Sequence, residues 1–247
     1  YQYYFYNGFK NIFNGFVNES YDLNKNINLL IELQLAYHKY RLYNERYLNT
    51  DFSISNLFFN PRIGLNYKLN QLQNIFISFA RVTREPRLKN YYDAAESSAG
   101  EIPQFELDSN GKYDFNSPLV KPETMNDIEI GTFFSDNNFS LNLNLFYMLF
   151  KDEIIKNGKV DRFGQPITGN VDQTTHVGIE LTASFKLFNT VEIFGNASYS
   201  KNKISNGKYF INDTTAIDIS KNSISGFPEF LSNLGIQFSS NGIFVKL

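Results

Sequence analysis

The sequence contains no cysteine and no tryptophan, and its 25 acidic residues nearly balance its 23 lysines and arginines. Without cysteine, the chain forms neither a disulfide framework nor a thiolate metal site. A net charge of −2 without a basic run disfavours nucleic acid as a partner, because such proteins present a basic face. Nucleophile elbows, phosphate-binding glycine loops and zinc motifs are also missing from the sequence. We therefore expect no enzyme, no cofactor and no metal site.

Long hydrophobic runs are also missing, although hydrophobic residues make up 42% of the chain. No stretch approaches the roughly 18 apolar residues of a transmembrane helix. The chain opens on Tyr1-Gln2-Tyr3 without a basic and then apolar export signal. If the protein is exported, this N-terminus is not the native one, so we expect an internal piece.

Period-two alternation of apolar and polar residues is the dominant pattern, and it predicts β-strands. In residues 139–149 the odd positions are apolar, and Ser140, Asn142 and Asn144 alternate with them. A helix does not gather this pattern on one side, because its faces repeat every 3.6 residues. The same alternation recurs at 27–37, 63–69 and 177–185. The 25 phenylalanines and 16 tyrosines fit this prediction, since aromatic side chains favour strands.

The connections between these runs are alternately short and long. Turns of two to four residues, rich in Asn, Asp and Gly, lie at 24–26, 70–73, 136–138, 188–190 and 241–242. Longer polar connections are expected at about 44–57, 84–123, 157–173 and 205–227. This arrangement places all the short turns at one end and all the long loops at the other, as in outer-membrane barrels.

The pattern predicts an all-β fold, an antiparallel up-and-down transmembrane β-barrel segment of about ten strands. The expected strands are 10–22, 27–43, 59–69, 74–83, 124–135, 139–156, 174–187, 191–204, 229–240 and 243–247. A soluble half-exposed sheet also alternates, but these strands are long and their polar face is rich in Asn, Ser, Gln and Glu. We expect one domain over 1–247, truncated at both ends, that forms an open curved sheet rather than a closed barrel.

Five short motifs resemble the barrel of TonB-dependent receptors, and they occur in the order found in that family. The first is Pro61-Arg62-Ile63-Gly64-Leu65-Asn66-Tyr67, and the second is Arg84-Glu85-Pro86 at the end of an aromatic strand. The others are Lys121-Pro122-Glu123 with Glu129-Ile130-Gly131, Phe146-Tyr147 with Asp152-Glu153-Ile154, and Gly178-Ile179-Glu180. The motifs cover residues 60–180, and their order carries the resemblance.

The resemblance implies a receptor in the bacterial outer membrane that takes up a scarce solute, powered through TonB. A ferric siderophore or a similar iron complex is the cargo most often found in the family. The implied partners are outer-membrane lipid, the TonB complex and the small-molecule cargo, with no nucleic acid. The family barrel has about 22 strands, so this piece covers less than half and lacks the plug domain. The alternatives are a passive outer-membrane diffusion channel and an adhesive or structural barrel.

The 84–123 connection is the best candidate for ligand binding, because loops longer than about 12–15 residues are usually functional or disordered. Its aromatic and charged residues either form part of a solute vestibule or shield the barrel mouth. The candidate ligand-binding residues are Arg84, Tyr91, Tyr92, Asp93, Glu96 and Phe105. For Arg84 and its neighbour Glu85, a structural brace is favoured over ligand contact.

Charged residues at polar-face positions are expected to face the lumen. They are Glu32, Arg62, Glu129, Glu180 and Glu192. They either contact a plug or line a solute route, or they are simply solvated or paired. His38 and His176 lie far apart in the sequence, and we interpret them as lone lumen or rim residues rather than metal ligands.

Overall fold

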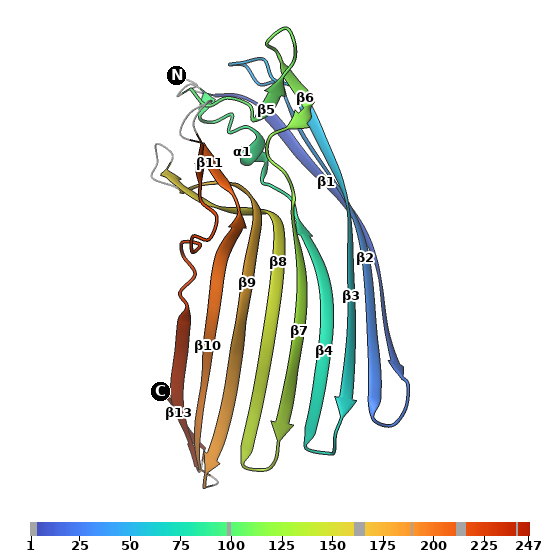
Figure 1. Cartoon of the computed structure of the whole chain (residues 1–247), viewed down its shortest axis with the longest axis vertical. Helices are drawn as coiled ribbons and strands as arrows, with labels where there is room; N and C mark the ends of the chain where they lie inside the picture. Colours follow the sequence, from blue (N-terminus) through green and yellow to red (C-terminus); the bar gives the residue numbers. More distant parts are fainter. Residues whose placement is uncertain (1–3, 98–99, 161–165, 189, 211–215, 241) are drawn as a thin grey trace.

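The computed structural model describes residues 4–97, 100–160, 166–188, 190–210, 216–240 and 242–247. Within this part of the chain, ten strands form one antiparallel sheet, and their order across the sheet follows their order along the chain (Figure 1). The strands are β1 (Asn7–Asp22), β2 (Ile27–Tyr43), β3 (Phe52–Lys68), β4 (Gln73–Arg84), β7 (Glu123–Ser135), β8 (Phe139–Val160), β9 (Pro166–Leu187), β10 (Val191–Asn206), β13 (Phe230–Ser240) and β14 (Ile243–Lys246). The prediction of ten antiparallel up-and-down strands is therefore confirmed.

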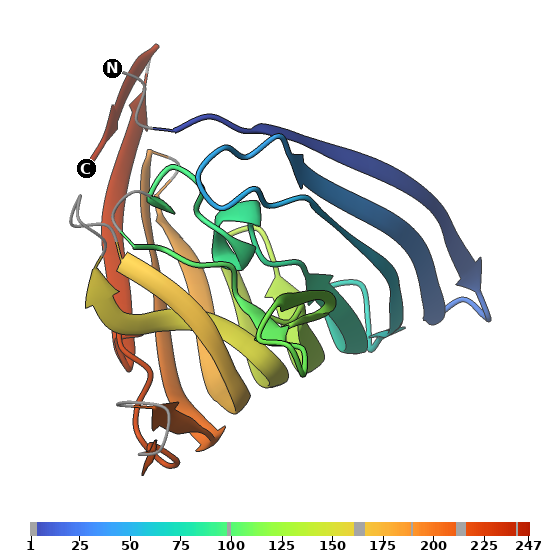
Figure 2. The same ribbon diagram turned by 90° about the horizontal axis from the view of Figure 1, so that it is seen from above.

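The sheet is curved and open. Strands β1 and β14 are its two edges, so the described sheet does not close on itself. Seen from above, the strands follow an arc, and the segment with the short helix α1 (Leu88–Tyr91) lies on its concave side (Figure 2). The expectation of an open curved sheet is confirmed. No helix among the described residues has the length and hydropathy needed to span a bilayer.

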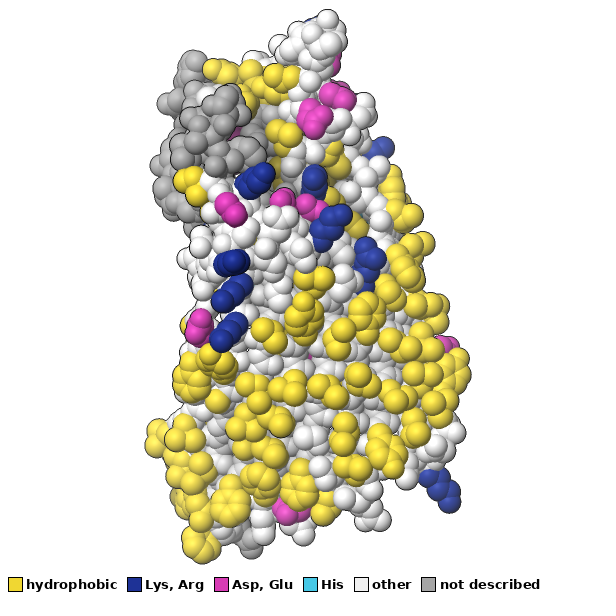
Figure 3. Space-filling view, viewed as in Figure 1, with side chains coloured by type: hydrophobic (Ala, Val, Ile, Leu, Met, Phe, Trp, Pro, Cys, Tyr) yellow, Lys and Arg dark blue, Asp and Glu magenta, His cyan; other side chains and the backbone are white. Residues whose placement is uncertain are grey.

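The register assigns each side chain in the sheet to one of two faces, because directly paired residues on neighbouring strands point to the same side. One row of paired residues carries Ile31, Ile63, Phe79, Ile128, Tyr147 and Val177. The adjacent row, on the other face, carries Leu30, Gly64, Ser78, Glu129, Phe146 and Gly178. Apolar side chains cover the lower half of the convex face (Figure 3). We call this surface the apolar band.

On the concave face, phenylalanine rings cover glycines on the adjacent strands. Phe76 pairs with Gly131, Phe146 with Gly178, and Phe194 with Gly235. A Cβ placed on Gly178 would lie 2.6 Å from Cζ of Phe146 and 2.6 Å from the backbone oxygen of Tyr199. Only glycine leaves room for the ring, which gives a physical reason for Gly131 and Gly178 in the sequence motifs.

Several strands extend further beyond the apolar band than the sequence predicted. Strand β3 begins at Phe52 rather than 59, and β8 and β9 continue to Val160 and from Pro166, so most of 157–173 is strand and not loop. The β3 extension escaped prediction because its alternation is inverted. Phe52 and Ile54 point inward and Ser53 and Ser55 point outward, so the outer side of the sheet is polar at this level.

The long connections contain additional structure that the sequence did not predict. The 84–123 connection holds α1 and the hairpin of β5 (Phe105–Leu107) and β6 (Tyr113–Pro118). The 205–227 connection holds a second small hairpin, β11 (Lys208–Phe210) with β12 (Ala216–Asp218). A small hydrophobic core joins the 84–123 connection to the sheet. It contains Leu42, Phe52, Ile54, Tyr91, Tyr92, Ala94 and Phe105.

Candidate solute-binding cavity

A cavity of about 620 Å³ lies on the concave face, where β1, β2, β4, β8 and β9 approach the 84–91 segment. Its lining is strongly basic. The lining contains the cations Lys10, Arg84, Arg87, Lys89 and Lys156, and among its described residues the only carboxylate is Glu85. Arg87, Lys89 and Lys156 are exposed, and none of the three forms an ion pair within the described residues. The cavity therefore presents free positive charge to whatever enters it.

Glu85 joins the wall of this cavity to β1 and β2. Its side chain is only 8% exposed, forms an ion pair with Lys10, and accepts a 3.1 Å hydrogen bond from the Tyr40 hydroxyl. Nδ1 of His38 lies 3.0 Å from the other carboxylate oxygen. Pro86, directly after it, is fully buried. These contacts fix the point at which the chain leaves β4, so Glu85 serves as a brace.

Arg84 holds the opposite side of the cavity. Its guanidinium donates a 2.7 Å hydrogen bond to Glu123 Oε2 and a 3.2 Å bond to the backbone oxygen of Ile154. The backbone N–H of Ile154 donates to the same Glu123 oxygen at 2.8 Å. Arg84 thus links β4, β7 and β8, and it also lines the cavity. Of the six predicted ligand-binding residues, it alone lines this cavity.

The predicted aromatic residues of the 84–123 connection lie inside the protein. Tyr91, Tyr92 and Phe105 are each at most 3% exposed, and the Phe105 and Phe52 ring centroids are 5.0 Å apart. Burial raises the pKa of Tyr92 to about 12 and that of Tyr91 further, since both hydroxyls are removed from water. In this conformation the three rings support the loop instead of offering surface to a solute.

The two acidic residues predicted in the same loop lie next to this core. Glu96 is largely buried, and its backbone N–H donates a 2.9 Å hydrogen bond to the backbone oxygen of Asp93. Nearby, burial together with the charges of Asp93 and Glu96 raises the pKa of Glu101. Ligand contact by Asp93 and Glu96 stays a prediction.

The five residues predicted to face the lumen all lie on the concave face. Each is paired across the sheet with residues that also point to the concave face. Arg62 and Glu32 contact each other, with 3.2 Å between Nη1 and Oε2. The register brings the remaining three, Glu129, Glu180 and Glu192, to the same face without joining them into one cluster. Their roles as plug contacts or route residues stay predictions.

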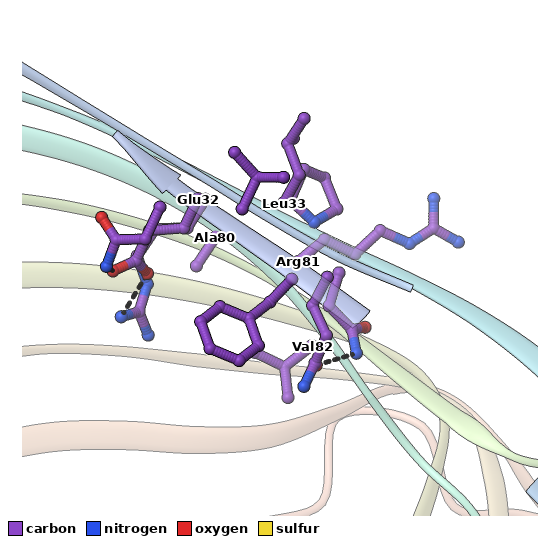
Figure 4. A pocket seen from close by; sticks show the side chains of 12 residues that line it. Glu32, Leu33, Ala80, Arg81 and Val82 are labelled. Atoms are coloured by element: carbon purple, nitrogen blue, oxygen red, sulfur yellow. Dashed lines mark hydrogen bonds and ion pairs between the residues drawn. The ribbon is translucent and has the colours of Figure 1, made fainter. Parts of the chain in front are cut away.

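A second, smaller cavity of about 290 Å³ lies beside Glu32 (Figure 4). Leu33, Ala80, Arg81 and Val82 also line it, and the pairing of β3 with β4 ends here, at Arg62 and Ala80. Pro61, which directly precedes Arg62 in β3, has no N–H to continue the pairing. The cavity therefore lies where β3 and β4 separate.

A buried polar cluster near the long-loop end was not predicted. His176 Nδ1 lies 2.7 Å from the Asn202 side-chain oxygen, and its Nε2 lies 3.2 Å from Glu153 Oε2. Thr174 also donates to Glu153. His176 is therefore not a lone residue. Strict alternation did not place Glu153 here, and the preceding Asp152, with φ of +54°, departs from the regular strand conformation. No cluster of three or more potential metal ligands occurs among the described residues.

The fold is shared with solved transporters and receptors at low sequence identity. Examples are the copper transporter OprC (TM-score 0.70, 12% identity), the siderophore receptor PiuA from Acinetobacter baumannii (0.67, 16%) and the ferric-catecholate import receptor Fiu from E. coli K12 (0.65, 17%). The matches cover 94–96% of this chain and 32–33% of those proteins. The chain thus spans about a third of the length of these proteins. No curated protein matches.

The family comparison covers nearly the whole chain. Residues 1–244 match the family model for the TonB dependent receptor-like β-barrel. The family consists of transporters rather than enzymes, which agrees with the absence of catalytic motifs noted in the sequence. The matched range, the ten-stranded open sheet and the five ordered motifs lead to one conclusion: this chain belongs to the TonB-dependent receptor family, as part of its β-barrel.

Proposed function

We propose that this chain forms part of the wall of an outer-membrane receptor that takes up a ferric siderophore or similar iron complex, powered through TonB. The observation that carries the proposal is the family match over residues 1–244. Residues 1–247 would then be one partial barrel domain whose apolar band faces lipid. The TonB complex would act through a plug domain that is not part of this sequence.

The cargo part of the proposal rests on two supports. Several structurally similar proteins are described as siderophore or ferric-complex receptors, although one is a copper transporter. The basic cavity is an independent support from this chain. Its excess of Lys and Arg favours a solute that carries negative charge, such as a carboxylate-bearing metal chelate.

The proposal is tested with the complete gene that encodes this chain, expressed in a bacterial host without its own iron-complex receptors. Uptake of radiolabelled iron from a panel of ferric complexes is compared between hosts with and without TonB. We expect uptake of at least one complex that is lost without TonB. Uptake that is independent of TonB would favour the passive channel, and no uptake of any solute would favour an adhesive or structural barrel.

A further inference from the structure

A third cavity, of about 290 Å³, lies at the long-loop end, between the tip of the β8–β9 hairpin and the 205–227 connection. Its floor consists of branched aliphatic side chains that pack together. They are Ile155, Val171, Ile204, Ile219 and Ile224. Among its described lining residues there is no aromatic side chain, so the apolar part of the lining is aliphatic. We call this space the isoleucine cavity.

The tip of the β8–β9 hairpin separates the isoleucine cavity from the basic cavity. The ends of these strands bend toward β11 (Figure 1). Directly paired residues point to the same side, so Ile155 and Gly169 share one face of the hairpin, and Lys156 and Thr168 share the other. The first face lines the isoleucine cavity and the second lines the basic cavity. Lys156 lines both, so one cation borders the two spaces.

Hydrogen bonds hold the opposite wall of the isoleucine cavity in place. The backbone N–H of Ile204 donates to the backbone oxygen of Asn222 at 2.9 Å, and that of Ile224 donates to the backbone oxygen of Asn202 at 3.0 Å. Isoleucine and valine side chains are also stiff, because branching at Cβ restricts their rotamers. The cavity is therefore formed in advance, and a ligand that enters it has little to order.

Two glycines show which side of the aliphatic cluster is filled and which side is open. A Cβ placed on Gly207 would lie 2.9 Å from Cγ1 of Val171 and 3.0 Å from Cγ2 of Ile204. A Cβ placed on Gly169 would have no heavy atom within 4 Å, and Gly169 lines the cavity. The open space therefore lies beside Gly169, where the missing side chain leaves the aliphatic floor accessible.

The polar part of the lining favours an anion. Lys156 and Lys208 are exposed, and no aspartate or glutamate is found among the described lining residues. Lys208 is paired across its small hairpin with Asp218, but neither lysine forms an ion pair within the part of the chain that the structure describes. Ser223 and Ser225 add hydroxyl groups that are able to donate hydrogen bonds to a carboxylate.

We infer that the isoleucine cavity binds a short aliphatic chain that ends in a carboxylate. The chain would lie on the aliphatic floor beside Gly169, with its carboxylate near Lys156 and Lys208. The volume is at the lower end of the roughly 300–1,000 Å³ typical of ligand sites, which limits the chain to a short one. Two sources share this chemistry: a free fatty acid, and an aliphatic acid arm of a solute held in the basic cavity. The second source rests on the proposed function.

The test uses the complete receptor, purified in a neutral detergent, with hexanoate as the probe. Binding of radiolabelled hexanoate is measured by equilibrium dialysis, and detergent without receptor gives the blank. Acetate lacks the chain and should bind at least about tenfold more weakly than hexanoate. Hexanol lacks the charge and should bind at least about threefold more weakly. Acetate or hexanol that binds as well as hexanoate would overturn the inference.

A variant that fills the cavity tests its place in the structure. We expect Gly169→Phe to weaken hexanoate binding at least about tenfold, because the ring occupies the space over the aliphatic floor. Gly15→Phe on β1 is the matched control, since its Cβ also meets no heavy atom within 4 Å, and its binding should stay within about twofold of the wild type. Equal binding by the two variants would overturn the inference.

A second variant tests the charge and does not depend on how well the filled cavity folds. Lys156→Gln with Lys208→Gln should weaken hexanoate binding roughly three- to tenfold and leave hexanol binding within about twofold, because both lysines are exposed. Lys25→Gln with Lys68→Gln removes the same charge at the short-turn end and should change hexanoate binding by less than about twofold. Equal weakening by the two pairs would overturn the inference.

Saturating ferric citrate distinguishes the two sources of the chain. Hexanoate that stays bound beside ferric citrate indicates a free fatty acid as a separate ligand. Hexanoate that ferric citrate displaces indicates one continuous site, in which Lys156 joins the head of a solute to its aliphatic arm. Loss of TonB-dependent uptake with intact hexanoate binding would count against the proposed function alone.

Discussion

Nε2 of His176 lies 3.2 Å from Oε2 of Glu153, and both side chains are only 6–7% exposed. The two residues come from β9 and β8, and Thr174 and Asn202 complete their hydrogen bonding. A polar group at this depth is stable only while its partners are present, because an unpaired buried group keeps its full desolvation cost.

Removing Glu153 should therefore destabilise the protein. We expect Glu153→Ala to lower the free energy of unfolding by about 3 kcal/mol, since it leaves His176 and Thr174 without their acceptor. Glu153→Gln should cost less, because its side-chain oxygen still accepts a hydrogen bond. Thermal unfolding of the complete receptor in detergent measures both. Lys151→Ala, an exposed change on the same strand, is the control, and an equal effect of the two alanine variants would contradict the prediction.

The loop between β2 and β3 should loosen in acid. Burial by itself raises the pKa of Glu45, but hydrogen bonds from Thr50 and from the amides of Tyr47 and Leu48 outweigh it and hold the pKa below its ordinary value. A lowered folded-state pKa means that the charged carboxylate stabilises the loop above the unfolded pKa of about 4.3, and that this contribution is lost as the pH falls through the folded-state value.

Hydrogen exchange measures this loosening at the amides of Tyr47 and Leu48. We expect their protection to decrease as the pH falls below about 4, after correction for the intrinsic pH dependence of exchange. The Glu45→Gln variant should be less protected at neutral pH and nearly independent of pH in this range. Protection in the wild type that does not change between about pH 6 and about pH 3 would disprove the account.

Neutralising the basic cavity should weaken binding of anionic solutes. For Arg87→Gln with Lys89→Gln, we expect the Kd of an anionic ferric complex such as ferric citrate to rise roughly three- to tenfold, because two exposed cations contribute about 0.2–1 kcal/mol each. A neutral ferric complex should change by less than about twofold. Fluorescence or calorimetric titration of the complete receptor gives both values.

The matched control for the cavity is Lys25→Gln with Lys68→Gln, which changes the charge equally at the short-turn end. Equal weakening by both pairs would show that net charge, rather than the cavity, sets the affinity. Equal weakening of anionic and neutral complexes by the cavity pair would indicate altered loop structure in place of lost charge complementarity.

Filling the space opposite Phe146 should strain the sheet. We expect Gly178→Ala to lower the free energy of unfolding by about 1–3 kcal/mol, because the added methyl group overlaps both the ring and the Tyr199 backbone oxygen. Gly15→Ala on β1 is the control, since no heavy atom lies within 4 Å of the position that its added methyl group would take. Thermal unfolding in detergent compares the two, and similar stabilities would rule out the ring-over-glycine explanation.

The sequence by itself determined the strands of the apolar band. Alternation along 139–149 or 177–185 predicts strands with one apolar and one polar face, because successive side chains of a strand point to opposite sides. The same alternation, with short and long connections, predicted ten strands, an open antiparallel sheet and the concave position of Glu32 and Arg62. The outward position of Lys201 and Lys203 follows from the same period.

Only the tertiary structure decided the arrangement of the chain beyond the apolar band. There the outside is no longer apolar, so Phe52 and Ile54 turn inward and the simple pattern is inverted. Tyr91 and Phe105 resembled ligand-binding aromatics, but contact with Phe52 makes them a core. The basic cavity joins Lys10, Arg87 and Lys156 from distant parts of the sequence. Such contacts depend on how the loops fold onto the sheet, and no local period along the chain encodes that.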